Sequence, residues 1–235
     1  MAVFTPGDAF SYAKTMVKSM RLDDIKLRIL FDALSLIWHA APWEWTIGEI
    51  AESPITVTTN TSEYTITVPS DFSRLEMAIL SDGANIFKPL GIRSYVPTNS
   101  MQTGETIEVA KLSGQSKVRV YPKSPASLPA TTQKIILLYK KTTPNLTSSD
   151  YASTTILALP DDWFHVYCLA VLYYAYLYAD DDRAGGAIVE PTRQGANIRY
   201  SGIRGQLEAE LEQMRMKLPL LRVMDVRADM INSKG

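Results

Sequence analysis

The stretch LPDDWFHVYCLAVLYYAYLYADDDR, residues 159–183, decides the fold because its centre carries no charge. From Trp163 to Ala179 there is no Asp, Glu, Lys or Arg. As a helix this segment would be roughly 26 Å long, slightly short of the ~30 Å hydrocarbon layer of a membrane. Tyrosines are spread along it, whereas the tyrosines of a membrane span gather at the two interfaces. We therefore expect a helix that protein buries on every side, with part of that protein supplied by neighbouring subunits.

The composition is that of a globular protein, with 46% hydrophobic and 21% charged residues in a chain of 235. This length suits one large domain or two small ones. The formal net charge of −1 excludes a generic polyanion binder, and the single cysteine, Cys168, excludes a disulfide framework. The first residues, MAVFTPGDAF, have neither the basic region nor the apolar run of a secretory signal. We therefore expect a protein that is made and kept in a reducing cytosol.

The spacing of apolar residues changes along the chain. Residues 8–20, with Asp8 as the expected cap, and residues 22–41 have the spacing of helices, and Pro42 ends the second one. From Trp43 to Lys141 the period is two, which is typical of strands with one wet face. Turn residues separate at least six expected strands: 63–68, 74–80, 84–90, 106–109, 117–121 and 134–140.

Helical spacing returns after a linker rich in Thr and Ser over 142–155. We expect a helix to about Ala179, a loop or arm over 187–202 and an amphipathic helix over 203–218. The sequence thus predicts an α+β fold, in which a helical bundle from both chain ends carries a large inserted antiparallel β-sandwich or barrel. The expected parts are the first helices (1–42), the β insertion (43–141), the rest of the bundle (142–218) and a tail for partner docking (219–235).

The sequence lacks several common catalytic motifs. There is no phosphate-binding glycine loop, no His-Glu-x-x-His and no Gly-x-Ser-x-Gly. His165 and Cys168 could form a nucleophile pair, but both lie on the helix that we expect to be buried. We therefore expect no catalytic residue, no metal ligand and no cofactor.

Charged residues raise two further questions. Asp180, Asp181 and Asp182 could hold a hard cation, end the helix in solvent, or pair with arginines of a neighbour. The charged residues of the segment 111–141 are all Lys or Arg. In the segment 44–82 the charged residues are all Asp or Glu, with Arg74 as the one exception. Strands that exchange charges across the sheet could cancel this imbalance. Alternatively, it marks a head-to-tail contact between copies or a basic rim that faces a polyanion.

Three segments, taken in order, resemble the sequence pattern of a known protein family: WEWT (43–46), YTITVPSDF (64–72) and LPDDWFHVYCLAVLYYAYLY (159–178). With the flanking helices, this pattern is similar to that of the head-to-tail adaptor (connector) proteins of tailed bacteriophages. The resemblance implies a structural virion protein of the neck, made in the host cytoplasm, without enzymatic activity. Such proteins form a ring, commonly dodecameric, under the portal, which joins the capsid to the tail and lets the genome pass. The larger β insertion and the glycine-rich arm depart from smaller members and leave the tail-side partner open.

The resemblance also suggests roles for particular residues. The portal protein and a tail protein would be the partners, with transient non-specific DNA in the channel and no membrane. Arg222 and Arg227 would dock the portal or tail. The alternatives are another neck protein, such as a stopper or tail-completion factor, or an unrelated soluble binding module. The expected subunit interface is Trp163, Tyr167, Tyr174, Asp180, Asp181, Asp182 and Arg183, and the expected basic patch toward the channel or a partner is Lys111, Lys117, Arg119 and Lys123.

Overall fold

The computed structural model describes residues 4–17, 20–51, 64–81, 87–93, 108–111, 117–121, 134–192 and 195–218. The chain divides into two compact units. One unit joins Met1–Trp45 to Thr143–Leu220 and contains the helices. The other consists of Thr46–Thr142 and Leu221–Gly235, and its described part is built from strands.

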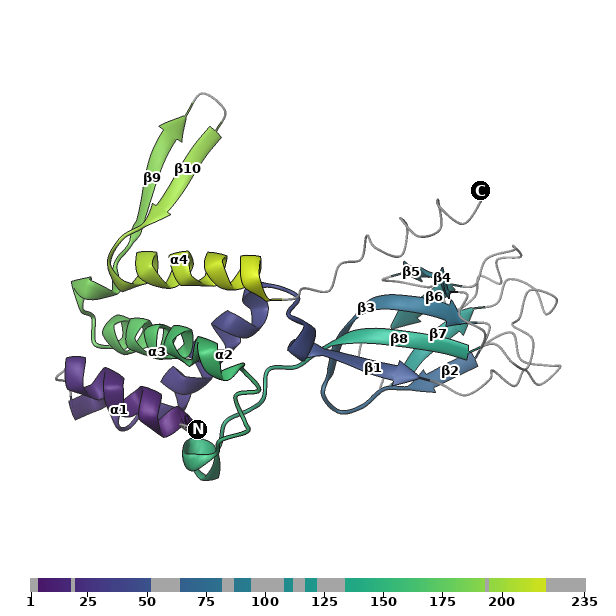
Figure 1. The fold of residues 1–235 in the computed structure, drawn as a ribbon, viewed down its shortest axis with the longest axis horizontal. Coiled ribbons are helices and arrows are strands. Elements are labelled where there is room, and N and C mark those ends of the chain that lie inside the picture. The colour runs from purple at the N-terminus through teal and green to yellow at the C-terminus, as the bar shows by residue number, and fades with distance from the viewer. Residues whose placement is uncertain are drawn as a thin grey trace. The chain divides into compact units, whose positions relative to one another are not determined.

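The helix unit is organised around one helix, α3. Its described residues form four α-helices, α1 (Pro6–Met16), α2 (Lys26–Ala40), α3 (Phe164–Tyr178) and α4 (Gly202–Lys217), which are labelled in Figure 1. Helix α3 packs against each of the other three, because it has apolar residues on all faces. The largest buried side chains of this unit are Leu22, Ile29, Leu30, Leu34, Ile37, Trp43, Tyr167, Leu207 and Leu211.

Local chemistry sets the helix ends. Helix α1 begins at a capping box, in which Thr5 N–H donates to Asp8 Oδ2 (2.9 Å) and Asp8 N–H donates to Thr5 Oγ1 (3.1 Å). The cap is therefore Thr5, and the expectation that Asp8 is the cap was wrong by three positions. Helix α3 follows a short 3₁₀ turn, Asp161–Trp163, which begins directly after Pro160.

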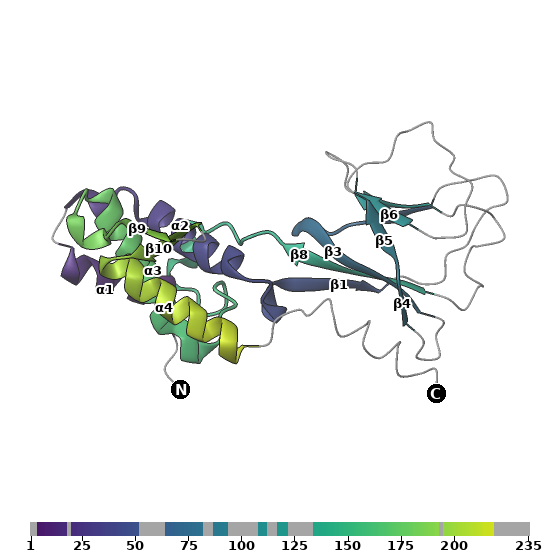
Figure 2. The same cartoon turned by 90° about the horizontal axis from the view of Figure 1, so that it is seen from above.

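The described part of the β unit contains two four-stranded sheets. One has the order β1 (Ile47–Ala51), β8 (Lys134–Lys141), β3 (Phe72–Ser81), β4 (Phe87–Pro89). The other has the order β2 (Tyr64–Thr67), β7 (Lys117–Tyr121), β6 (Glu108–Lys111), β5 (Gly91–Arg93). Figure 2 shows how β4 leads into β5 and so passes from the first sheet to the second.

The two sheets share one hydrophobic core. Ile66 and Val118 from the second sheet cluster with residues of the first, among them Phe72 and Leu137. Each strand runs antiparallel to its neighbours except β5, which pairs with β6 in parallel. The expectation of a wholly antiparallel insertion was therefore wrong at this pair. The 14 residues between the two strands, 94–107, are long enough for the crossover that a parallel pair requires.

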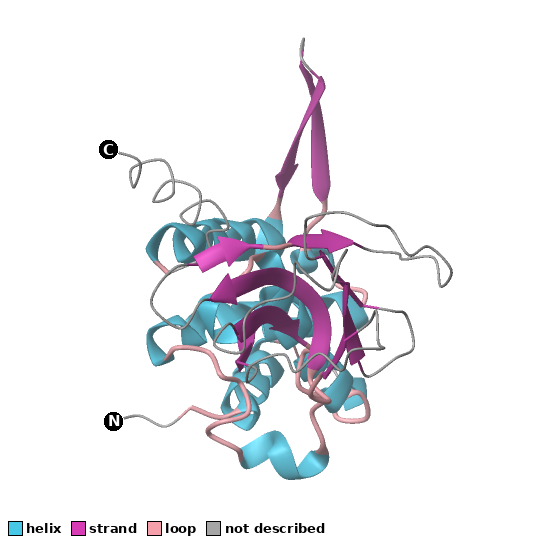
Figure 3. Ribbon diagram, turned by 90° about the vertical axis from the view of Figure 1, so that its right-hand side faces the viewer, coloured by secondary structure: helices cyan, strands magenta, loops and turns pink. Residues whose placement is uncertain are grey.

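A β-hairpin forms the segment expected to be a loop or arm over 187–202. Strands β9 (Ala187–Thr192) and β10 (Gly195–Tyr200) pair antiparallel with each other. Figure 3 shows the hairpin standing out from the helices. Its strands are short, β9 contains Pro191 and β10 begins at Gly195, and for this reason the sequence pattern did not reveal them.

Candidate interaction surface on the helix unit

Helix α3 is covered on three sides and open on the fourth. Val166, Ala170 and Val171 are fully buried against the surrounding helices. On the open side, His165 is exposed and Leu177 keeps 48% of its surface accessible. Leu169 and Tyr173 lie between them, half-buried, at helical spacings of four. The single chain thus leaves a stripe of its most apolar helix partly in contact with solvent, among its apolar side chains most of all at Leu177.

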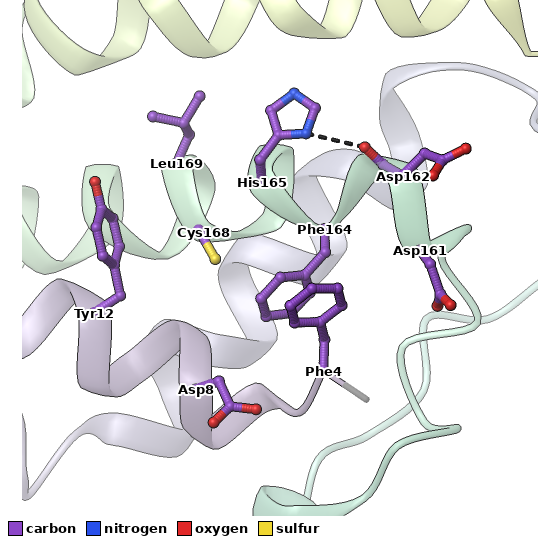
Figure 4. A pocket seen from close by; sticks show the side chains of 9 residues that line it. All are labelled: Phe4, Asp8, Tyr12, Asp161, Asp162, Phe164, His165, Cys168 and Leu169. Carbon is purple, nitrogen blue, oxygen red and sulfur yellow. Dashed lines mark hydrogen bonds between the residues drawn. The ribbon is translucent and has the colours of Figure 1, made fainter. Parts of the chain in front are cut away.

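A groove of about 860 Å³ lies beside this stripe, between α1 and α3. Figure 4 shows the rings of Phe4 and Phe164 lying parallel within it, with centroids 4.4 Å apart. Tyr12, 42% exposed, borders it from α1. The lining residues are Phe4, Asp8, Tyr12, Asp161, Asp162, Phe164, His165, Cys168 and Leu169. Apolar side chains in contact with solvent over such a surface are typical of a protein contact.

The groove carries acidic residues. Asp8, Asp161 and Asp162 line it, and Asp161 and Asp162 are exposed. None of the nine lining residues is Lys or Arg. An apolar groove with a negative border favours a partner surface that is apolar with a basic edge.

The thiol in the groove is not activated. Burial raises the pKa of Cys168 to about 11, with a smaller contribution from Asp8. An activated nucleophilic thiol has its pKa lowered instead. His165 Nδ1 lies 3.1 Å from the carbonyl oxygen of Asp162, and its Nε2 lies 3.2 Å from Glu210 Oε2. Both ring nitrogens of the histidine therefore have protein partners within the helix unit.

The aromatic residues expected at a subunit interface are in part core residues. Trp163 is 8% exposed and Tyr167 is fully buried. Tyr167 donates its hydroxyl to the carbonyl oxygen of Leu30 on α2 (3.1 Å), and burial raises the pKa of this tyrosine. Tyr174 is half-buried and packs edge to face with Tyr173, with ring centroids 5.1 Å apart. The sequence predicts burial of all three aromatic side chains, which is confirmed for Trp163 and Tyr167 but not for Tyr174. Any contact of these residues with another copy stays a prediction.

The aspartate run ends α3. Asp180 has a positive φ of 55° and donates its N–H to the carbonyl oxygen of Leu177, while Asp181 N–H donates to that of Tyr176. These two bonds form a Schellman motif in which Asp180 occupies the position that glycine usually takes. Arg183 forms a two-point ion pair with Asp181, with Nε donating to Oδ1 and Nη2 to Oδ2, which holds the pKa of this carboxyl at about 2. Asp181 thus pairs with an arginine of its own chain, while Asp180 and Asp182 are exposed.

The described residues contain no cluster of three or more His, Cys, Asp or Glu that could hold a metal ion. In the same part of the chain, no helix combines the length and apolar character needed to cross a membrane.

The expected basic patch is only partly within the described residues. Lys111 ends β6, and Lys117 and Arg119 lie on β7, at register positions opposite Thr67 and Thr65. Lys123 lies outside the described residues. The expected docking residues Arg222 and Arg227 also lie outside them.

Sequence reasoning missed the contribution of α1 to this surface. Phe4, Tyr12 and Met16 are among the exposed large hydrophobic residues of the chain. Tyr12 and Met16 are four positions apart and so share one side of α1. This spacing can be read from the sequence. The apolar spacing of Phe10, Ala13 and Val17 is stronger, however, and it indicates only the buried face of the helix.

A comparison with known families yields one match. The model of a family described as SU10 adaptor protein matches residues 17–220. The match includes the strands of the β unit, helices α2 to α4 and the hairpin. No curated protein matches the chain.

Proposed function

Since the chain belongs to the SU10 adaptor protein family, we propose that it forms a ring beneath the portal of a tailed bacteriophage. In this proposal the ring joins the capsid to the tail, holds about twelve copies, and lets the genome pass through its channel. The role is structural, without catalysis.

The observation that carries this proposal is the open side of α3. A helix that is apolar on all faces is stable when protein covers all of them. One chain covers three sides, and the stripe from Leu169 to Leu177 with the adjoining groove is left for a neighbour. In a closed ring, every copy presents this surface to the next one, and the same heterologous contact repeats until it closes.

Residues near the open side divide into two groups in this proposal. Trp163 and Tyr167 hold α3 in its own unit. Tyr174 and the exposed Asp180, Asp182 and Arg183 belong to the interface between copies. The acidic border of the groove suits a contact with basic residues of the neighbouring copy.

Different segments of the adaptor would have different partners. Arg222 and Arg227 of the C-terminal segment dock the portal, and the sheets of the β unit, as a sandwich or barrel, face the phage tail. The core shared by Ile66, Val118 and Leu137 supports such a closed β unit. Lys111, Lys117, Arg119 and Lys123 face a partner or the channel, where DNA passes without sequence-specific contacts.

The raised pKa of the groove thiol supports a role without catalysis. At neutral pH a thiol with a pKa of about 11 stays protonated, so the pair of His165 and Cys168 lacks the thiolate that nucleophilic catalysis needs.

Light scattering and negative-stain electron microscopy of the purified protein test the ring. We expect closed rings whose mass corresponds to about twelve copies of the 26.2 kDa chain. Leu177→Asp, on the open side of α3, should prevent assembly, whereas Thr154→Asp, at an exposed position that does not line the groove, should not. A parent protein that stays monomeric, alone and with portal rings added, would rule out this function.

A further inference from the structure

The hairpin of β9 and β10 has unpaired strand edges. Among the residues that the structure places, these two strands pair only with each other. Figure 1 shows the hairpin rising from the start of α4, clear of the other helices. A lone two-stranded hairpin is marginally stable in water, and its outer edges present free N–H and C=O groups to any third strand.

The register shows which backbone groups point outward. Ser201 N–H donates to the carbonyl oxygen of Gly186 (3.0 Å), so these two residues form a hydrogen-bonded pair. Hydrogen-bonded and non-hydrogen-bonded pairs alternate along an antiparallel ladder. The next pair, Ala187 with Tyr200, is therefore non-hydrogen-bonded. Every second pair beyond it is also non-hydrogen-bonded. The residues of these pairs turn their backbone N–H and C=O groups away from the partner strand, toward the outer edges of the hairpin. The pairs are Ala187 with Tyr200, Val189 with Ile198, and Pro191 with Ala196.

The outer edges of β9 and β10 differ in the backbone N–H groups that they can donate. The edge of β9 includes Pro191, which has no N–H to donate. Proline on an edge strand is a common means by which proteins prevent further pairing. The edge of β10 offers the complete N–H and C=O groups of Ala196 and Ile198 and the N–H of Tyr200, whose carbonyl oxygen lies against Gly205 of α4. Pairing with a third strand is thus blocked on β9 and available on β10.

The base of the hairpin sets the direction of this edge. Gly185 (φ 82°) and Gly202 (φ 60°) have positive φ, and a Cβ added to Gly185 would lie 1.9 Å from the carbonyl oxygen of Ser201. The Arg204 guanidinium lies over the rings of both Tyr173 and Tyr200, 5.2 and 5.1 Å from their centroids. The base is therefore held to α3 and to the first turn of α4.

We propose that the outer edge of β10 pairs with the edge strand β1 of a neighbouring copy. This inference rests on the proposed ring, in which one chain supplies both halves of a repeated contact. In the described part of the β unit, β1 pairs with β8 alone and is the longest edge strand, with five residues and no proline. The six residues of β10 are enough to span its length, and main-chain hydrogen bonds give such strand addition its affinity.

A matched pair of proline variants tests the proposal. Ile198→Pro removes one outward N–H from the β10 edge, and Val189→Pro removes one from the β9 edge. Residues 189 and 198 face each other in the register, so both variants spare the hydrogen bonds inside the hairpin. We expect Ile198→Pro to raise the protein concentration at half-assembly at least about tenfold, and Val189→Pro to change it less than about twofold.

The outcomes are distinct. Equal assembly of both variants, or a defect of Val189→Pro alone, would refute the β10 edge and leave the ring standing. A parent protein that never assembles would refute the ring and this inference together.

Cross-linking supplies a second test that needs no proline. In a Cys168→Ser background, Ala196→Cys with Glu49→Cys should give chains joined between copies by a short bismaleimide, since Glu49 lies on β1 and is exposed. Ala196→Cys with Thr154→Cys is the control, since Thr154 is also exposed and lies outside every strand. Equal yields from the two combinations would refute the contact with β1.

Discussion

The substitution Tyr167→Phe tests whether α3 is the centre of the helix unit. Tyr167 is fully buried, and its hydroxyl donates to the carbonyl oxygen of Leu30 over 3.1 Å. Phenylalanine keeps the ring and removes one buried hydrogen bond. Leu30 lies inside α2, where its carbonyl oxygen also accepts the helical bond, so no buried acceptor is left without a partner. The expected loss is about 1 kcal/mol in the free energy of unfolding.

Tyr167→Ala should cost much more, because it also removes the ring. Truncating a buried aromatic side chain costs about 3–5 kcal/mol through lost transfer free energy and the remaining cavity. Leu177→Ala on the same helix is the control, since Leu177 is 48% exposed. We expect a change within about 0.5 kcal/mol for this variant in dilute protein.

Tryptophan fluorescence during urea denaturation is the appropriate assay. All four tryptophans of the chain, Trp38, Trp43, Trp45 and Trp163, belong to the helix unit, so their emission reports the unfolding of that unit. If Tyr167→Ala and Leu177→Ala shift the urea midpoint equally, α3 is not the buried centre, and the reasoning about its open side fails.

Three further predictions concern other parts of the chain. Burial lowers the pKa of Lys140 from 10.5 to about 8, so between these values the unfolded chain binds more protons and the free energy of unfolding should rise with pH. Lys140→Met combined with Thr46→Val, which removes both partners of a buried hydrogen bond, should abolish that rise in urea titrations at pH 7.5 and 10. Gly185→Ala should lower the melting temperature, since its φ is positive and the added Cβ would meet Ser201, whereas Gly186→Ala meets no atom within 4 Å and should not. Thr5→Ala should cost about 1 kcal/mol in thermal unfolding, because it breaks the capping box of α1; an unchanged melting temperature would contradict that role.

Much of the fold could be predicted from the sequence where local pattern and tertiary environment agree. The helical spacing over residues 22–41 and 203–218 is present in α2 and α4. The alternating segment at 117–121 and the apolar run at 134–140 are strands β7 and β8. In α2, α4 and most of β8 one face meets the core and the other is more exposed, so periodicity reports the structure directly.

Other elements depended on partners distant in the sequence. The hairpin of β9 and β10 contains proline and glycine and has little periodicity, so its pairing follows from register and from the glycines at its base. The parallel pair of β5 and β6 could not be foreseen either, because strand direction depends on how the chain crosses between sheets.

The candidate surface was predictable only in part. An uncharged run from Trp163 to Ala179 identifies a helix that needs protein on all sides, because burying a charge there would be costly and burying apolar groups is favourable. The sequence by itself therefore determined that α3 is a core helix. Only the tertiary structure decided which side stays open, because Tyr12 of α1 and Leu177 of α3 are far apart in the chain and their exposure depends on the packing of whole helices.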